Sequence, residues 1–141
     1  MARQAEAEWK GDLKGGSGRV KLGSGAYEGN YSFATRFENG SGANPEELVG
    51  AALAGCYSMA LANSLASAGF TATSVHTTAD VHLAKDDTGF LINLIELTVT
   101  AVVSNVDNEV FQQHVEKTNV GCIIKRSLAA VPTITVKASL K

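Results

Sequence analysis

The stretch that decides the fold is NPEELVGAALAGCYSMA, residues 44–60. It begins with a helix start signal, because Asn44 is a favoured N-cap residue and Pro45 suits the first helical position. Glu47 follows Asn44 by three residues, which makes a capping-box pattern. The run after it is dominated by Ala and Gly, so neighbouring backbones can approach it closely. One cysteine, Cys56, lies in the middle of this smooth helix.

This helix is expected over about 45–68, and Gly69 is a suitable stop signal. Shorter segments with alternating or turn-rich patterns surround it. Strands are expected before it at 5–11, 18–24 and 29–37, and after it as a long hairpin of 73–84 with 90–104. A second helix from Asp107 to about Lys117, an interruption at TNVG (118–121), a short helix at 122–130 and a last strand at 133–140 complete the chain.

The order of these elements predicts an α+β fold in one domain over residues 1–141. We expect a mostly antiparallel, curved sheet around a long buried central helix. One helix on a curved sheet leaves much surface uncovered in a chain of 141 residues. A dimer that buries the central helices together is therefore expected.

Composition excludes several classes of function. The 12 basic and 14 acidic residues nearly balance, and no basic stripe with interleaved aromatics is present, so nucleic acid is not an expected partner. The apolar-rich stretch 48–68 contains Ser, Asn and Gly throughout, which makes it too polar for a membrane span and typical of a core helix. The start, MARQAEAEWK, lacks the apolar region of a secretory signal. We expect a soluble cytoplasmic protein.

The chain has two cysteines, Cys56 and Cys122, which are far apart and form no CxxC pair. In a reducing cytosol a structural disulfide is not the first expectation. The three histidines, His76, His82 and His114, make no ligand-spaced cluster with either cysteine, so no metal site is predicted.

A cysteine in an Ala-rich helix is most often inert packing. For Cys56 to react, a nearby cation must favour its thiolate, and the positive end of its own helix lies about three turns away. Arg36 is the best local candidate, at the end of the strand expected over 29–37. If Arg36 points inward it needs a carboxylate, and Glu46 is the first-turn acid that the capping box leaves free. The alternatives are a solvated arginine and a helix-start charge.

Helix geometry limits how these residues can cooperate. Glu46 and Cys56 are ten positions apart, hence about 15 Å apart along the helix axis and roughly 80° apart around it. One chain cannot clamp an arginine from its own Glu46 tightly onto its own Cys56. If the three residues share a site, we expect Arg36 and Glu46 to come from the partner chain of an antiparallel helix pair.

Cys122 opens the short helix that begins CIIKRS, residues 122–127. Amide groups at a helix start should favour a thiolate or a departing sulfur at this position. The alternative is a buried, inert cysteine beside Ile123 and Ile124. Lys125 and Arg126 add positive charge nearby, although we expect both to face solvent.

At these residues the chain resembles a known family, the osmotically inducible protein C (OsmC) proteins, close relatives of the organic hydroperoxide resistance proteins. The resemblance covers nearly the whole chain. It runs through AEWKGDLKGGSGRV (7–20), FATRFENGSGANPEELVGAALAGCYSMAL (33–61), AGFTATSVHTTADV (68–81) and the GC at 121–122. The stretch from 36 to 61 is its most specific part.

The resemblance implies a cysteine-based thiol peroxidase that works as an intertwined homodimer, with two active sites at the interface. By position, Cys56 corresponds to the peroxidatic cysteine and Cys122 to the resolving one. Arg36 corresponds to the activating arginine and Glu46 to its carboxylate partner. It also implies reduction by a lipoyl-type or other dithiol, with no metal or flavin cofactor. The expected link to the osmotic stress response is equally a family property.

The chain departs from the family in two places. Relatives often have Pro after the second cysteine, whereas this chain continues with Ile123 and Ile124. At position 53, where relatives often carry His, it has Leu53, and we expect no peroxidatic role to be lost there.

Apolar residues around Cys56 predict a preference for organic hydroperoxides over hydrogen peroxide. Two alternatives stay open. One is a thiol–disulfide oxidoreductase or redox sensor that uses the same pair of cysteines. The other is a non-enzymatic dimeric binding protein with two inert core cysteines.

Overall fold

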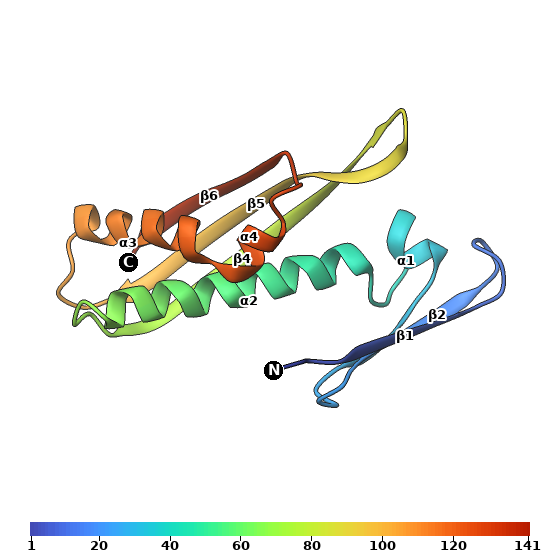
Figure 1. Cartoon of the computed structure of the whole chain (residues 1–141), viewed down its shortest axis with the longest axis horizontal. Helices are drawn as coiled ribbons and strands as arrows, with labels where there is room; N and C mark the ends of the chain where they lie inside the picture. The colour runs from blue at the N-terminus through green and yellow to red at the C-terminus, as the bar shows by residue number, and fades with distance from the viewer. The chain divides into compact units, whose positions relative to one another are not determined.

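The structure is a computed structural model that describes all residues from Met1 to Lys141. The chain divides into two compact units, Met1–Leu48 and Val49–Lys141 (Figure 1). The boundary lies within helix α2, Pro45–Ala66, whose first turn belongs to the first unit. The single domain expected over 1–141 stays a prediction.

The first unit is a three-stranded antiparallel sheet followed by a short helix. Its strands β1 (Ala5–Lys10), β2 (Ser17–Leu22) and β3 (Glu28–Tyr31) pair in the order β1-β2-β3. The first two strands confirm the sequence prediction. The third is wrong beyond Tyr31, because helix α1 (Phe33–Phe37) replaces the second half of the strand expected over 29–37.

A capping box explains why the chain turns into a helix at this point. Ser32 is the N-cap of α1, and its Oγ accepts a hydrogen bond from the backbone N–H of Thr35 at 3.2 Å. In return, the N–H of Ser32 donates to Thr35 Oγ1 at 2.9 Å. Two backbone donors at the helix start are thereby satisfied, which outweighs the strand propensity of the aromatic residues in the segment.

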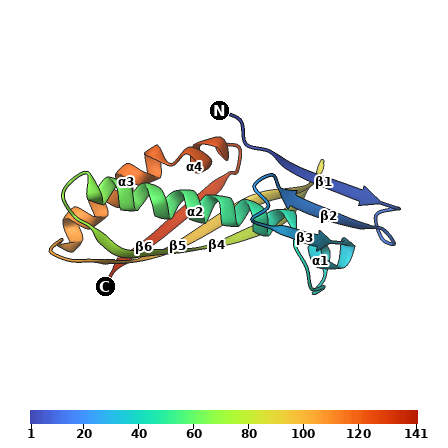
Figure 2. The same cartoon turned by 90° about the horizontal axis from the view of Figure 1, so that it is seen from below.

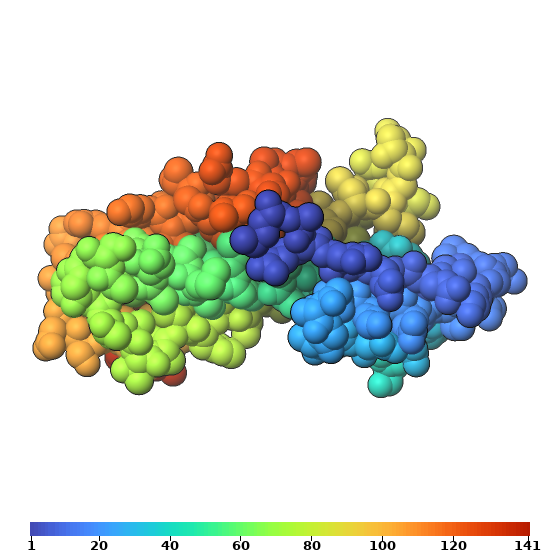
Figure 3. Space-filling model, turned by 60° about the horizontal axis from the view of Figure 1, so that its bottom comes forward, coloured from blue at the N-terminus to red at the C-terminus, as the bar shows by residue number.

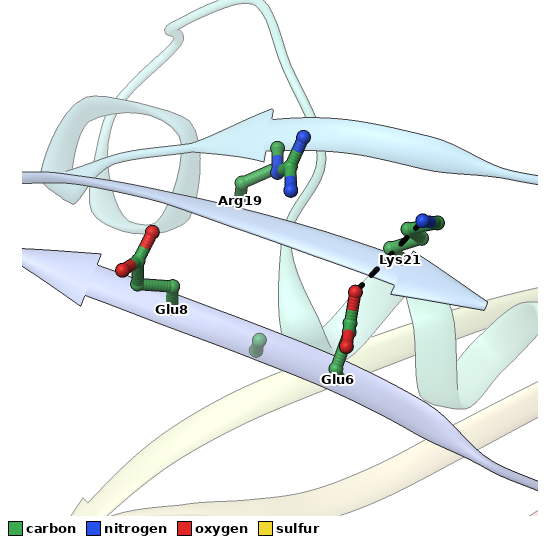
Figure 4. A pocket seen from close by; sticks show the side chains of 5 residues that line it. Glu6, Glu8, Arg19 and Lys21 are labelled. Carbon is green, nitrogen blue, oxygen red and sulfur yellow. Dashed lines mark ion pairs between the residues drawn. The ribbon is translucent and has the colours of Figure 1, made fainter. Parts of the chain in front are cut away.

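One face of this sheet carries alternating charges. The register places Glu6 opposite Lys21 and Glu8 opposite Arg19 on neighbouring strands. Figure 4 shows these four side chains along β1 and β2, with the Glu6–Lys21 ion pair at 4.0 Å. Opposite charges directly across a ladder favour this register, but exposed pairs of this kind add little stability.

The first unit has almost no core of its own. Its buried residues are Thr35, Ala43 and Glu46. An aromatic contact between Trp9 and Tyr31, with ring centroids 5.4 Å apart, involves two half-buried side chains. This part of the chain is therefore held by backbone pairing and polar contacts more than by packing.

The second unit is a three-stranded sheet with helices on one face. The long strands β4 (Ala72–Asp86) and β5 (Gly89–Val103) form the expected antiparallel hairpin, and β6 (Thr133–Leu140) pairs with β5 in parallel. Helices α2, α3 (Asn108–Gly121) and α4 (Ile123–Ser127) lie along the same face of this sheet (Figures 1 and 2). The α+β class and the mostly antiparallel pairing are confirmed.

The core of this unit lies between the sheet and the helices. Strand β5 turns alternate residues toward the helices, which is the two-residue period of a strand. The fully or nearly buried apolar side chains are Leu53, Tyr57, Leu61 and Leu65 of α2, Ile95, Leu97, Val99, Ala101 and Val103 of β5, Phe111 and Val115 of α3, and Cys122. One thiol is thus part of the packed core.

The interruption expected at 118–121 is wrong, because α3 continues through TNVG to Gly121. Thr118 is 3% exposed, and its Oγ1 donates to the carbonyl of His114 at 2.7 Å. The N–H of Cys122 then donates to the carbonyl of Thr118 at 2.9 Å. Burial and these bonds outweigh the weak helix propensities of Thr, Asn and Gly.

Helix α2 ends as the sequence predicts. Its last helical residue is Ala66, and Gly69 follows with φ of +88°. Around that glycine the N–H of Phe70 bonds back to the carbonyl of Leu65 at 3.0 Å. A residue with a Cβ would be strained at this φ, so glycine suits the position.

Only one face of α2 is buried within the unit. Leu53 and Tyr57 are fully buried, whereas Met59 is 73% exposed, and the green α2 segment lies open to the surface in Figure 3. By length and composition alone α2 could cross a membrane, since an 18-residue window has a mean hydropathy of 1.4. The expectation that this stretch is too polar is therefore wrong. The core helix of a soluble protein passes the same test, and one face of α2 is buried in the core of this unit.

Candidate active site

The two cysteines, far apart in the sequence, meet in the second unit. Cys56 lies mid-way along α2, and Cys122 lies at the junction where α3 ends and α4 begins. Cys122 Sγ donates to Cys56 Sγ over 3.3 Å, and both side chains are free thiols. Cys122 is fully buried while Cys56 is half-buried. The partly accessible thiol is therefore the one that a small oxidant reaches first.

Burial raises the pKa of Cys122, and the neighbouring Cys56 adds to the rise. The backbone N–H groups of Lys125 and Ile124 act in the opposite direction, as expected at a helix start, but they do not outweigh desolvation. Burial therefore opposes the thiolate that the helix start was expected to favour at Cys122, and the expected role as a departing sulfur stays a prediction. Cys122 is a protonated donor that points its S–H at the sulfur of Cys56.

The expected arginine–carboxylate pair forms in the first unit. Arg36 Nη2 lies 2.7 Å from Glu46 Oε1, and Arg36 Nε donates to Oε1 at 3.1 Å and to Oε2 at 3.3 Å. The Glu46 side chain is 11% exposed and that of Arg36 is 42% exposed. A two-point pair of this kind fixes the plane of the guanidinium as well as its position.

The local fold explains how Arg36 reaches Glu46. Arg36 lies in the last turn of α1, not at a strand end as the sequence suggested. Asn44 connects this turn to the start of α2: its Oδ1 accepts from the N–H of Glu47 at 2.7 Å, and its Nδ2 donates to the carbonyl of Thr35 at 3.3 Å. The predicted N-cap therefore also anchors α1 beside the first turn of the long helix.

An aromatic pocket of about 210 Å³ lies beside Arg36 in the same unit. Its lining consists of Trp9, Leu13, Tyr31, Ser32, Phe33, Arg36 and Phe37. The guanidinium carbon of Arg36 lies 5.2 Å from the ring centroid of Phe37, a cation–π distance. A pocket that combines aromatic walls with one guanidinium suits an apolar molecule with a single polar end.

The histidines take no part in this arrangement. His82 Nε2 lies 3.0 Å from Glu96 Oε2 on the exposed face of the sheet, and His76 is exposed on that face as well. His114 Nδ1 lies 2.8 Å from Ser64 Oγ between α3 and α2. No group of three or more His, Cys, Asp or Glu side chains is placed to hold a metal ion.

Two residues near the thiols escaped the sequence analysis. Tyr57, next to Cys56, is fully buried, and its hydroxyl donates to Asn119 Oδ1 at 2.9 Å. Asn119 lies in the TNVG segment that the sequence suggested was a break in the helix. An apolar helix face that includes Tyr57 gives no signal of a polar partner, so only the packing of α2 against α3 reveals this bond.

Known proteins share this fold and much of this sequence. The family model described as OsmC-like protein matches residues 38–137. Peroxiredoxin OsmC of Escherichia coli K12 is 45% identical over 133 residues, which cover 94% of this chain and 93% of the relative.

Two solved structures show the same architecture. An organic hydroperoxide resistance protein from Elizabethkingia anophelis, with thiocyanate bound, superposes with a TM-score of 0.71 at 25% identity, over 100% of this chain and 97% of that one. An OsmC-like protein of unknown function from Vibrio cholerae has a TM-score of 0.78 at 15% identity and 99% coverage of both chains.

The fold, the pair of thiols in contact and the named relatives together define the class of this protein: it is a thiol peroxidase. Within that class the chain belongs to the OsmC-like family. The resemblance noted on the sequence is confirmed.

Proposed function

We propose that Cys56 is the nucleophile that takes an oxygen atom from an organic hydroperoxide, and that Cys122 resolves the product. The observation that carries this proposal is the 3.3 Å approach of the two sulfurs, one half-buried and one fully buried. Two thiols at this distance can form a disulfide with little movement, as a redox pair must.

In the first step of the proposed reaction, the Cys56 thiolate attacks the terminal oxygen of the hydroperoxide. The O–O bond breaks, the departing alkoxide takes a proton and leaves as an alcohol, and Cys56 becomes a sulfenic acid. Arg36 is proposed to stabilise the thiolate and the negative charge that develops on the peroxide oxygens. Glu46 holds the guanidinium through Nε and Nη2, which leaves the donors of Nη1 for the substrate.

In the second step the Cys122 thiol condenses with the sulfenic acid. A Cys56–Cys122 disulfide forms, and the hydroxyl of the sulfenic acid leaves with the Cys122 proton as water. A dithiol, for which a lipoyl group is the proposed source, then reduces the disulfide by exchange and is itself oxidised to a disulfide. None of these steps requires a metal or an organic cofactor.

We propose that the working form is a homodimer in which Arg36 and Glu46 of one chain serve Cys56 of the other. The ideal length of α2 between Glu46 and Cys56, about 15 Å, supports this arrangement. The open face of α2 supports it too, because it carries Met59, 73% exposed, among the small residues Ala51, Ala52 and Gly55. A second helix can approach such a face closely. We place the dimer in the cytoplasm, where thiols stay reduced.

The test is a steady-state peroxidase assay with a dithiol donor and cumene, tert-butyl and hydrogen peroxides. We expect wild type to consume both organic peroxides faster than hydrogen peroxide, because the pocket beside Arg36 is aromatic. The Cys56→Ser protein is the control and should fall to background. If wild type reduces peroxide no faster than this control but still exchanges disulfides, the protein is an oxidoreductase or redox sensor instead.

A further inference from the structure

Cys122 has to reach Cys56 quickly after each oxidation, before a second peroxide molecule does. The sulfurs are 3.3 Å apart in the reduced protein, and a disulfide is about 2.05 Å long, so the remaining closure is only about 1.3 Å. Cys122 belongs to no regular element, since it is the C-cap of α3 and the N-cap of α4. Something must therefore fix this junction against α2.

The contacts around Asn119 provide that fixation. The side-chain Oδ1 of Asn119 accepts from the Tyr57 hydroxyl of α2 at 2.9 Å. Its backbone carbonyl accepts from Lys125 Nζ of α4 at 3.4 Å, and its Nδ2 donates to Glu116 Oε1 at 3.3 Å. One residue thus joins the helix before Cys122, the helix after it and the helix that carries Cys56.

The Tyr57 hydroxyl stays a hydrogen-bond donor in this network over the whole working pH range. The ring is fully buried in the core, and the hydroxyl shares its proton with the carbonyl of Val115 at 3.3 Å as well as with Asn119. Burial, followed by the charge of Glu116, raises the pKa of Tyr57 above its usual range. The phenol therefore stays protonated and remains a donor at every working pH.

We propose that Tyr57 and Asn119 are positioning residues for the resolving step: their hydrogen bond holds the α3–α4 junction so that Cys122 lies on the sulfur of Cys56. The network, called here the Tyr57–Asn119 clamp, includes Lys125 as its third member. It acts on Cys122 and not on the attack of Cys56 on peroxide. This inference rests on the proposed function, because it assumes that Cys122 resolves a sulfenic acid at Cys56.

The clamp makes the two steps separable by mutation. Tyr57→Phe removes one hydroxyl and leaves the ring in the core. One buried hydrogen bond contributes enough to change the population of the aligned junction by about tenfold. We therefore expect disulfide formation to slow by about tenfold, while the first oxidation of Cys56 stays within about twofold of wild type.

The experiment follows one turnover of the reduced full-length protein. Stopped-flow consumption of a single equivalent of cumene hydroperoxide gives the first step, which removes the Cys56 thiol, and loss of the second free thiol, that of Cys122, gives the second step. Intact mass after an excess of peroxide gives the yield of sulfinic acid at Cys56. We expect Tyr57→Phe to accumulate sulfenic acid, which a dimedone probe traps, and then sulfinic acid, whereas wild type gives mainly the disulfide.

Two further variants guard against a merely structural effect. Asn119→Leu has nearly the same shape without an acceptor for Tyr57 and should reproduce the slow resolution. Tyr27→Phe, at an exposed tyrosine of the first unit, is the matched control and should behave as wild type. Thermal unfolding of every variant checks that the fold persists; should Tyr57→Phe not fold, Asn119→Leu and Lys125→Met carry the test.

The outcomes are distinct. Wild-type resolution rates and sulfinic yields in both Tyr57→Phe and Asn119→Leu would overturn the clamp and leave the peroxidase intact. Wild type that forms neither sulfenic acid nor disulfide would overturn the proposed function itself. A fall in the first step equal to that in the second would show that the residues act on the fold as a whole, and would also overturn the proposal.

Discussion

The two compact units hold their functional candidates by different interactions: apolar packing in one, and an ion pair with hydrogen bonds in the other. Residues 49–141 hold both thiols on a packed core, in which Cys122 itself is fully buried. Residues 1–48 bury only Thr35, Ala43 and Glu46, and they fix Arg36 by charge and by hydrogen bonds. The proposed disulfide requires the two sulfurs to close by only about 1.3 Å, and tight packing holds a sulfur at such a distance. The Arg36 guanidinium, which we propose presents donors to a substrate, needs a fixed orientation and access to solvent.

The largest difference between the units should appear in stability. Leu53→Ala removes a fully buried side chain from the core of the second unit and should lower the free energy of unfolding by about 2–5 kcal/mol. Leu22→Ala, at a residue of β2 that is 38% exposed, should cost less than about 1 kcal/mol. Denaturant unfolding of both proteins measures this. Equal costs would contradict the view that the first unit is held mainly by polar contacts.

The next effect contrasts two arginines of the first unit. Each makes a 2.7 Å contact with a glutamate, but the Arg36–Glu46 pair has a nearly buried carboxylate and the Arg19–Glu28 pair is exposed on both sides. Arg36→Met should slow the reaction with cumene hydroperoxide by about 10²-fold, the usual loss when a donor to developing charge is removed.

Arg19→Met is the matched control for that substitution. It should stay within about twofold of wild type, because an exposed ion pair contributes little. Stopped-flow oxidation of the reduced proteins gives both rate constants. Equal losses in the two variants would mean that net charge, and not the position of Arg36, governs the reaction.

A smaller effect concerns the buried thiol and pH. Burial raises the pKa of Cys122 in the folded chain, so above its ordinary value the unfolded chain releases this proton while the folded chain retains it. The unfolded state then binds fewer protons, so stability is unaffected below about pH 8.5 and falls above it, by at most about 1.4 kcal/mol per pH unit.

Urea unfolding of the reduced protein at several values between about pH 7.5 and 9.5 measures this slope. Cys122→Ala lacks the titrating group, so its free energy of unfolding should fall less steeply than that of wild type over the same range. Parallel curves for the two proteins would show that Cys122 titrates alike in both states and would remove the argument that it is a protonated donor.

The sequence predicted most of what local signals encode. The start of α2 at Pro45, its stop at Gly69 and the pairing of Arg36 with Glu46 all rest on capping chemistry and on one spare carboxylate, which short stretches of sequence display. The start of α1 also has a local signal, because Ser32 and Thr35 stand at capping-box spacing, although the aromatic residues around them favour the strand that was expected.

What the sequence could not supply depends on packing between distant segments. The continuation of α3 through TNVG follows from burial of Thr118, and the protonated state of Cys122 follows from its place in the core. The bond between Tyr57 and Asn119 joins residues 62 positions apart. None of these features has a signal in a short stretch of sequence, since each arises only when α2 and α3 pack on the same face of the sheet.

The central claim is that Cys56 of one chain works with Arg36 of its partner. The direct test co-expresses an Arg36→Ala chain and a Cys56→Ser chain under two affinity tags and isolates the mixed dimer. Each parent homodimer should be nearly inactive, and the mixed dimer should recover about half of the wild-type peroxidase rate, because one of its two sites then has both residues. A mixed dimer as inactive as its parents would contradict the account.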